Sequence, residues 1–175
     1  RRVDLMTETS PSAAPELVTA LNQVLDGEYA AVWAYGRIGA EVSGERQSDA
    51  RDALRAHRSN RERIRAQLAG LGVAPTPPPA AYESPTLTNQ ADAEAWAQRI
   101  ELALVPRYSA LAAAQQGDPR AAAAADAQTC ATRAIRWGAD SQALPGIGSP
   151  SDAATQSGSS GSAPTTQSPS AQVSN

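Results

Sequence analysis

The chain has 175 residues and a formal net charge of −3, with 18 acidic side chains against 15 basic ones. This balance argues against a nucleic-acid partner, which would favour an excess of positive charge. The single cysteine, Cys130, excludes an internal disulfide. No apolar run approaches the ~18 residues of a membrane-spanning helix, so we expect no membrane partner and a cytoplasmic location.

The first half of the chain predicts two helices. The first should run from about residue 15 to about residue 42, because Pro15 suits the first helical position and apolar residues recur at helical spacing. These residues are Leu17, Leu21, Val24, Val32, Tyr35 and Val42. The second helix should run from about residue 46 to about residue 71 and end before Gly72.

A proline-rich stretch, residues 73–88, then interrupts the helical pattern and is typical of an extended connection. A third helix should follow, with Thr88 or Asn89 as its N-terminal cap. Gly117 marks a break before the fourth helix. This helix should begin with Asp118 as the cap and Pro119 in the first position, and run to about residue 137.

The lengths of the connections predict the topology. Short links join the first and second helices and the third and fourth helices, so each pair should form an antiparallel hairpin. The link at residues 73–88 can span roughly 50 Å when extended, whereas the second helix is only ~39 Å long. We therefore expect an all-α bundle of two hairpins joined by a long crossover, the ferritin-like arrangement. The alternative is an up-and-down bundle with a loose loop.

The two ends of the chain are not expected to belong to the bundle. Residues 149–175 contain only one charged residue, Asp152, and one large apolar residue, Val173, among small and polar residues. Such a segment cannot bury enough apolar surface to offset the entropy of ordering it. The sequence thus predicts a disordered extension at residues 1–14, a bundle at residues 15–148 and a disordered tail at residues 149–175.

Polar residues interrupt the apolar stripe of each helix. Glu28 does so on the first helix, His57, the only histidine, on the second, Glu101 on the third and Asp126 on the fourth. Carboxylates that face the interior of a bundle are costly unless they are paired or bound to a metal ion. Either buried ion pairs or metal ligation should therefore satisfy these groups.

Positions relative to the hairpin turns favour ion pairs. Glu28 precedes a first turn near Gly44 by almost the same length of chain by which Arg61 follows it. Glu101 and Arg133 are likewise equally far, before and after, from a second turn near residue 117. Residues at equal separation from a hairpin turn lie at the same height along the two helices, because each residue adds about 1.5 Å. We therefore expect two buried pairs, Glu28 with Arg61 and Glu101 with Arg133.

Four segments carry a resemblance to a known family. They are EYAAVWAYGRIGA, HRSNRERIRAQL, RIELALVPRYSAL and ALPGIG. Together with the two-hairpin layout they resemble an actinobacterial ferritin-like domain family of unknown function, over about residues 15–148. The resemblance implies a ferritin-like bundle and no particular activity.

Ferritin-like di-metal proteins place a single glutamate on the first and third helices and a Glu-x-x-His motif on the second and fourth. Glu28 and Glu101 match the single glutamates, and His57 matches the histidine of the second helix. Leu54 stands where the glutamate of that motif belongs. The ligand set is therefore incomplete on the second helix.

The fourth helix departs further, because Asp126 can stand for the glutamate but Thr129 stands where histidine belongs. We therefore expect a non-catalytic binding or assembly module without a cofactor, whose partner would be a second copy or another protein. The alternative is a divergent metal-binding oxidoreductase or metal-storage protein that holds iron or manganese with Glu28, His57 and Glu101.

Overall fold

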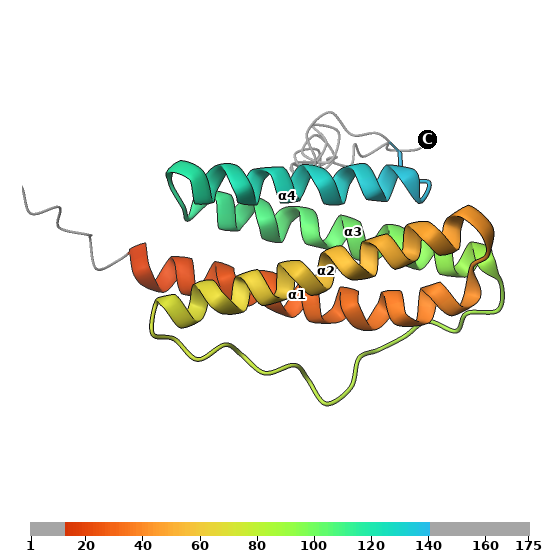
Figure 1. Cartoon of the computed structure of the whole chain (residues 1–175), viewed down its shortest axis with the longest axis horizontal. Coiled ribbons are helices and arrows are strands. Elements are labelled where there is room, and N and C mark those ends of the chain that lie inside the picture. Colours follow the sequence, from red (N-terminus) through yellow and green to blue (C-terminus); the bar gives the residue numbers. More distant parts are fainter. Residues whose placement is uncertain (1–12, 141–175) are drawn as a thin grey trace, which may run out of the picture.

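The computed structural model describes residues 13–140, which form four α-helices and no strand (Figure 1). The helices are α1 (Ala13–Glu41), α2 (Gly44–Gly70), α3 (Gln90–Ala113) and α4 (Gly117–Arg136). This arrangement confirms the all-α prediction. The predicted tail at residues 149–175 and most of the predicted N-terminal extension lie outside the described residues, while residues 13 and 14 already belong to α1.

The chain forms two antiparallel hairpins, α1–α2 and α3–α4, and residues 71–89 run back along the bundle between them (Figure 1). Helices α2 and α3 consequently run in the same direction, and α1 packs against α3 to join the hairpins. The crossover topology predicted from the link length is therefore confirmed, and the up-and-down alternative is wrong.

The crossover is attached to α1 by specific contacts. The backbone nitrogen and the hydroxyl of Thr76 both donate hydrogen bonds to the Asn22 side-chain oxygen, at 3.2 and 2.9 Å. Farther along, the ring of Tyr82 lies 5.4 Å from the ring of Trp33. These contacts hold the proline-rich link along one side of α1.

Two N-terminal caps were predicted, and only one of them is correct. Asn89 caps α3 by accepting a hydrogen bond from the backbone nitrogen of Asp92 at 3.0 Å. The N-cap position of α4, in contrast, is Gln116, and Asp118 lies within the first turn. Gly117 has a φ of +61°, which glycine adopts readily, so the chain turns into the helix before Asp118. The Asp118 carboxylate still favours the positive end of the helix dipole.

The core contains many alanines and few large side chains. Helices α1 and α3 approach so closely that a Cβ atom at Gly27 would lie 2.6 Å from Leu104 Cδ2. This close approach occurs beside Glu28, which is fully buried. Among the described residues, the other fully buried polar or charged side chains are His57 and Glu101. The site described below thus lies where α1 and α3 are in closest contact.

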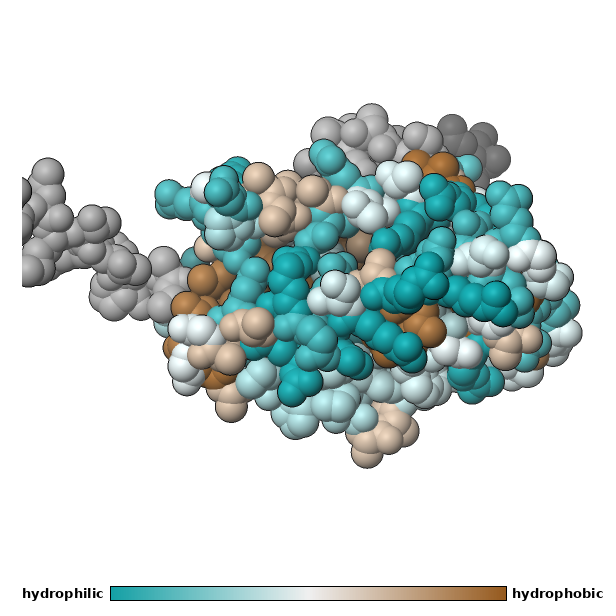
Figure 2. Space-filling model, viewed as in Figure 1, coloured by the Kyte–Doolittle hydropathy of each residue, from teal (hydrophilic) through white to brown (hydrophobic). Residues whose placement is uncertain are grey.

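The face of the molecule in Figure 2 is mainly hydrophilic, and its apolar residues appear as separate patches. Among the described helices, none has an apolar stretch of the length that crossing a bilayer requires.

Candidate functional site

Three helices each contribute one fully buried polar residue to a single cluster. Glu28 comes from α1, His57 from α2 and Glu101 from α3, and each has an exposed fraction of 0%. The Nδ1 atom of His57 lies 2.9 Å from Glu28 Oε2, and its Nε2 atom lies 3.1 Å from Glu101 Oε1. The imidazole ring therefore bridges the two carboxylates.

Two tyrosines complete the cluster. The Tyr35 hydroxyl of α1 donates to Glu101 Oε1 at 2.7 Å, and the Tyr108 hydroxyl of α3 donates to Glu28 Oε1 at 2.5 Å. Burial and then the neighbouring carboxylates raise the pKa of both phenols above their ordinary value. Both tyrosines therefore stay protonated and act as hydrogen-bond donors.

The sequence analysis assigned these tyrosines to the apolar stripes, although a spacing signal was present. Glu28 precedes Tyr35 by seven residues, and Glu101 precedes Tyr108 by seven. Seven residues are close to two helical turns, about 10 Å along one face. Because α1 and α3 run antiparallel (Figure 1), each tyrosine reaches the glutamate of the other helix.

The environment of His57 favours its charged form. Burial by itself lowers the pKa of His57, but hydrogen bonds to Glu101 and Glu28 and attraction to both carboxylates outweigh burial and raise it to about 9. Near neutral pH the ring is then an imidazolium whose two N–H groups donate to the two glutamates. Its charge offsets one of the two buried negative charges.

Cys130 occupies on α4 the place that His57 occupies on α2. Glu28 and His57 are 29 positions apart, and the difference between 101 and 130 is also 29. Cys130 is 1% exposed, and burial raises the pKa of its thiol, with Glu101 as the next cause. A protonated thiol therefore stands where the symmetry of the two hairpins would place a second imidazole.

The structure differs from the predicted buried arginine pairs. Arg61 binds Glu62 at 2.7 Å and is partly exposed, while Glu28 is paired with His57. No ion pair within 4 Å links Arg133 to Glu101 among residues 13–140. Because the imidazolium bridges both carboxylates, the arginines are not needed as counter-ions and avoid the cost of desolvation.

The predicted ligand positions on α4 are also displaced. Asp126 forms an ion pair with Arg63 at 2.5 Å, and exposed Thr129 donates to the carbonyl oxygen of Ala125 at 2.9 Å. The interior positions of α4 are Ala127 and Cys130, with exposed fractions of 8% and 1%. Neither residue supplies a carboxylate or an imidazole.

The cluster does not fit a dinuclear metal centre. Within residues 13–140, no group of three or more His, Cys, Asp and Glu side chains is arranged to hold a metal ion. The geometry explains why, since both ring nitrogens of His57 face carboxylate oxygens at hydrogen-bond distance. An imidazole that binds a metal must direct a nitrogen lone pair at it.

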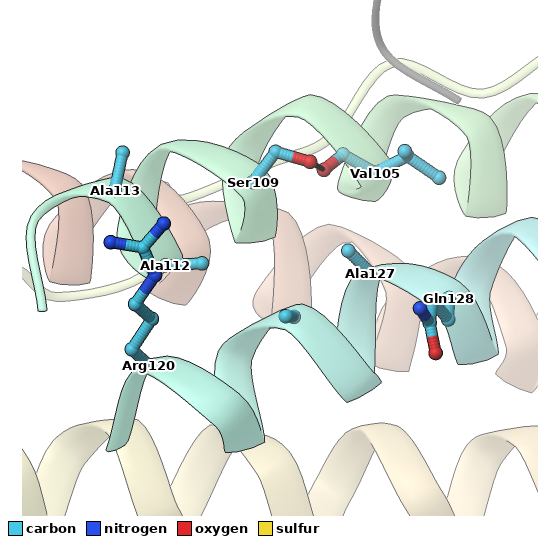
Figure 3. A pocket seen from close by; sticks show the side chains of 8 residues that line it. Val105, Ser109, Ala112, Ala113, Arg120, Ala127 and Gln128 are labelled. Atoms are coloured by element: carbon cyan, nitrogen blue, oxygen red, sulfur yellow. Dashed lines mark hydrogen bonds between the residues drawn. The ribbon is translucent and has the colours of Figure 1, made fainter. Parts of the chain in front are cut away.

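A separate pocket of about 300 Å³ lies between α3 and α4 and is lined mainly by alanines. Figure 3 shows Arg120 extending from the first turn of α4 toward Ala112 of α3. Val105 and Ser109 contribute the remaining α3 lining. The buried cluster and this pocket share no residue, so the pocket is not an entrance to the cluster.

Comparisons with known proteins agree with this fold. A family model described as "Domain of unknown function (DUF4439)" matches residues 20–149. The crystal structure of a conserved hypothetical protein, rv2844, from Mycobacterium tuberculosis is 28% identical, with a TM-score of 0.67 over 74% of this chain and 97% of that one.

A second crystal structure, of ferritin-like, diiron-carboxylate proteins from Bacillus anthracis str. Ames, is 18% identical. Its TM-score is 0.58, and the match covers 71% of this chain and 92% of that one. At this level of identity the likeness shows the ferritin-like fold alone. The comparison with curated proteins finds no match.

Proposed function

This chain belongs to the DUF4439 family, and we propose that it is a ferritin-like module in which a protonated histidine replaces the metal centre and which acts by binding a partner. An actinobacterial source is supported by the mycobacterial structure and by the use of arginine, without lysine, for every basic residue. The partner would be a second copy of the chain or another protein.

The bridging position of His57 is the observation that carries this proposal. The imidazolium places one positive charge between Glu28 and Glu101 and donates one hydrogen bond to each. Tyr35 and Tyr108 each donate a further hydrogen bond. Carboxylates that already accept charged and phenolic hydrogen bonds are largely satisfied, so they have little need of a cation.

Metal analysis of protein purified without a metal-affinity tag tests the proposal. We expect far less than one iron, manganese or zinc ion per chain, and no rise in melting temperature when each metal is added. A matched pair of variants would be measured beside the wild type. His57→Asn removes the bridge, whereas Arg58→Asn changes the exposed neighbouring position on α2.

A mononuclear metal protein is the second candidate, because Glu28, His57 and Glu101 do meet in one buried place. It would be a metal-storage protein or oxidoreductase that holds iron or manganese. One metal ion per chain that is lost in His57→Asn and kept in Arg58→Asn would overturn our proposal in favour of this candidate. Metal that is present equally in both variants would point to a different site.

A further inference from the structure

The four helices do not pack equally closely on all sides of the bundle. Helix α1 packs on α2 and α3, and α3 packs on α4, but within the described residues no close backbone packing joins α2 to α4. Closely packed helices have axes only ~8–10 Å apart. The α2–α4 side is therefore an open edge, and the α1–α3 contact opposite joins the two hairpins.

Charged side chains, rather than apolar ones, bridge this open edge at two places. Arg63 of α2 forms an ion pair with Asp126 of α4 at 2.5 Å. Near the start of α2, Arg46 donates a hydrogen bond to the carbonyl oxygen of Arg136 at 2.7 Å. The Arg46 guanidinium also lies 5.1 Å from the ring of Trp137. We call the Arg63–Asp126 pair and the Arg46–Trp137 contact the two latches.

Polar atoms without partners lie buried near this edge. Glu101 Oε2 and Arg133 Nη1 are buried and have no hydrogen-bond partner in the described part of the chain. Cys130 is 1% exposed, and its thiol senses the charges of Glu101, Glu28 and Arg133. If α4 moved away from α2, these groups would meet water, which would satisfy them.

We propose that the bundle opens along the α2–α4 edge, with the α1–α3 contact as the hinge and the two latches holding the edge closed. Ion pairs between partly exposed residues contribute little and are screened by salt. The other three helix contacts bury apolar side chains, whose exposure costs much more. Opening at this edge is therefore the least costly way to admit solvent and small molecules to Cys130 and Glu101 without unfolding the bundle.

The rate at which a small disulfide reagent such as DTNB modifies Cys130 measures this opening, because the chain has no other cysteine. We expect Arg63→Met to raise the rate about five- to tenfold, as the loss of an ion pair of this kind allows. Arg55→Met is the matched control, since Arg55 pairs with Asp52 on the same helix and is well exposed. Arg133 is left unchanged because its charge acts on the pKa of the Cys130 thiol.

Salt gives a second measurement that needs no variant. Raising NaCl from about 0.1 M to about 1 M shortens the Debye length from ~10 Å to ~3 Å. The wild-type modification rate should therefore rise severalfold, and this rise should be much smaller in the double variant Arg46→Met/Arg63→Met. The rate should also depend only weakly on low concentrations of urea, because a local opening exposes little surface.

Three results would overturn the proposal. The first is an equal acceleration in Arg55→Met and Arg63→Met. The second is a wild-type rate that does not respond to salt. The third is a urea dependence as steep as that of equilibrium unfolding, which would mean that Cys130 reacts only from the globally unfolded chain. These results concern the latches alone, so they leave the metal analysis of the His57 cluster unaffected.

Discussion

At the scale of single residues, one buried histidine organises the interior of this protein. His57 bridges Glu28 and Glu101, and its ring also stacks on Tyr35, with centroids 5.2 Å apart and an angle of 22°. Removing one partner of a buried charged pair is usually costly, because the other charge remains behind without compensation. The proton on His57 should therefore stabilise the fold.

This proton makes stability depend on pH in a defined direction. The pKa of His57 is raised from 6.5 to about 9 in the folded protein, so its contribution is complete below about pH 6.5 and is lost as the pH rises through 9. We expect the free energy of unfolding to fall by on the order of 3 kcal/mol across this range.

Urea unfolding at several pH values between 6 and 10 measures the effect. Within the buried cluster, the Tyr35, Tyr108 and Cys130 groups have pKa values raised above their ordinary range, so they stay protonated while His57 titrates. His57→Asn should lack the decline, because the chain has no other histidine. A decline of equal size in this variant would assign the pH dependence to another group.

At the scale of the helices, α2 and α4 lack the ligands that a dinuclear centre requires. A complete set needs Glu-x-x-His on each of these helices. On α2 the motif reads Leu54 and His57, and on α4 the interior positions are Ala127 and Cys130. Three substitutions would therefore complete both motifs around Glu28 and Glu101.

We predict that the triple variant Leu54→Glu/Ala127→Glu/Cys130→His gains about two manganese or iron ions per chain, because it completes a set of six ligands. The control variant is Leu54→Glu/Asp126→Glu/Thr129→His. It carries the same ligand types but places the α4 pair one residue earlier, where Thr129 is exposed. Elemental analysis and melting temperature with added Mn²⁺ would compare the two. Equal metal uptake by the control would show that the interior positions of α4 are assigned wrongly.

At the scale of the whole molecule, the family match extends past the described helices to residue 149. Beyond it, residues 150–175 contain little that could form a core. The end of α4, in contrast, is followed by Trp137, which is only 4% exposed and contacts Arg46. The boundary of the folded unit should therefore lie between these two points.

Truncation tests this boundary, which remains a prediction from composition. A chain that ends at residue 149 should melt within about 1 °C of the full chain, because surface segments away from the core contribute little to stability. A chain that ends at residue 136 loses the Trp137 side chain and should melt several degrees lower. A large loss of stability in the longer truncation would place part of the tail within the folded unit.

The sequence by itself determined the elements and their connection. Helix periodicity is a local property, so four helices could be predicted to within a few residues of the observed bounds. The crossover followed from the length of the link at residues 73–88. The same periodicity placed Glu28, His57 and Glu101 on interior faces, and all three are fully buried.

Only the tertiary structure decided which side chains satisfy the buried carboxylates. Counting residues from a turn predicts the height of a side chain along the bundle, but each residue also turns the helix by about 100°. This angle separates exposed Thr129 from buried Cys130, and it lets partly exposed Arg61 reach Glu62. The bridge through His57 depends on how three helices are rotated about their axes, which packing determines and local sequence does not.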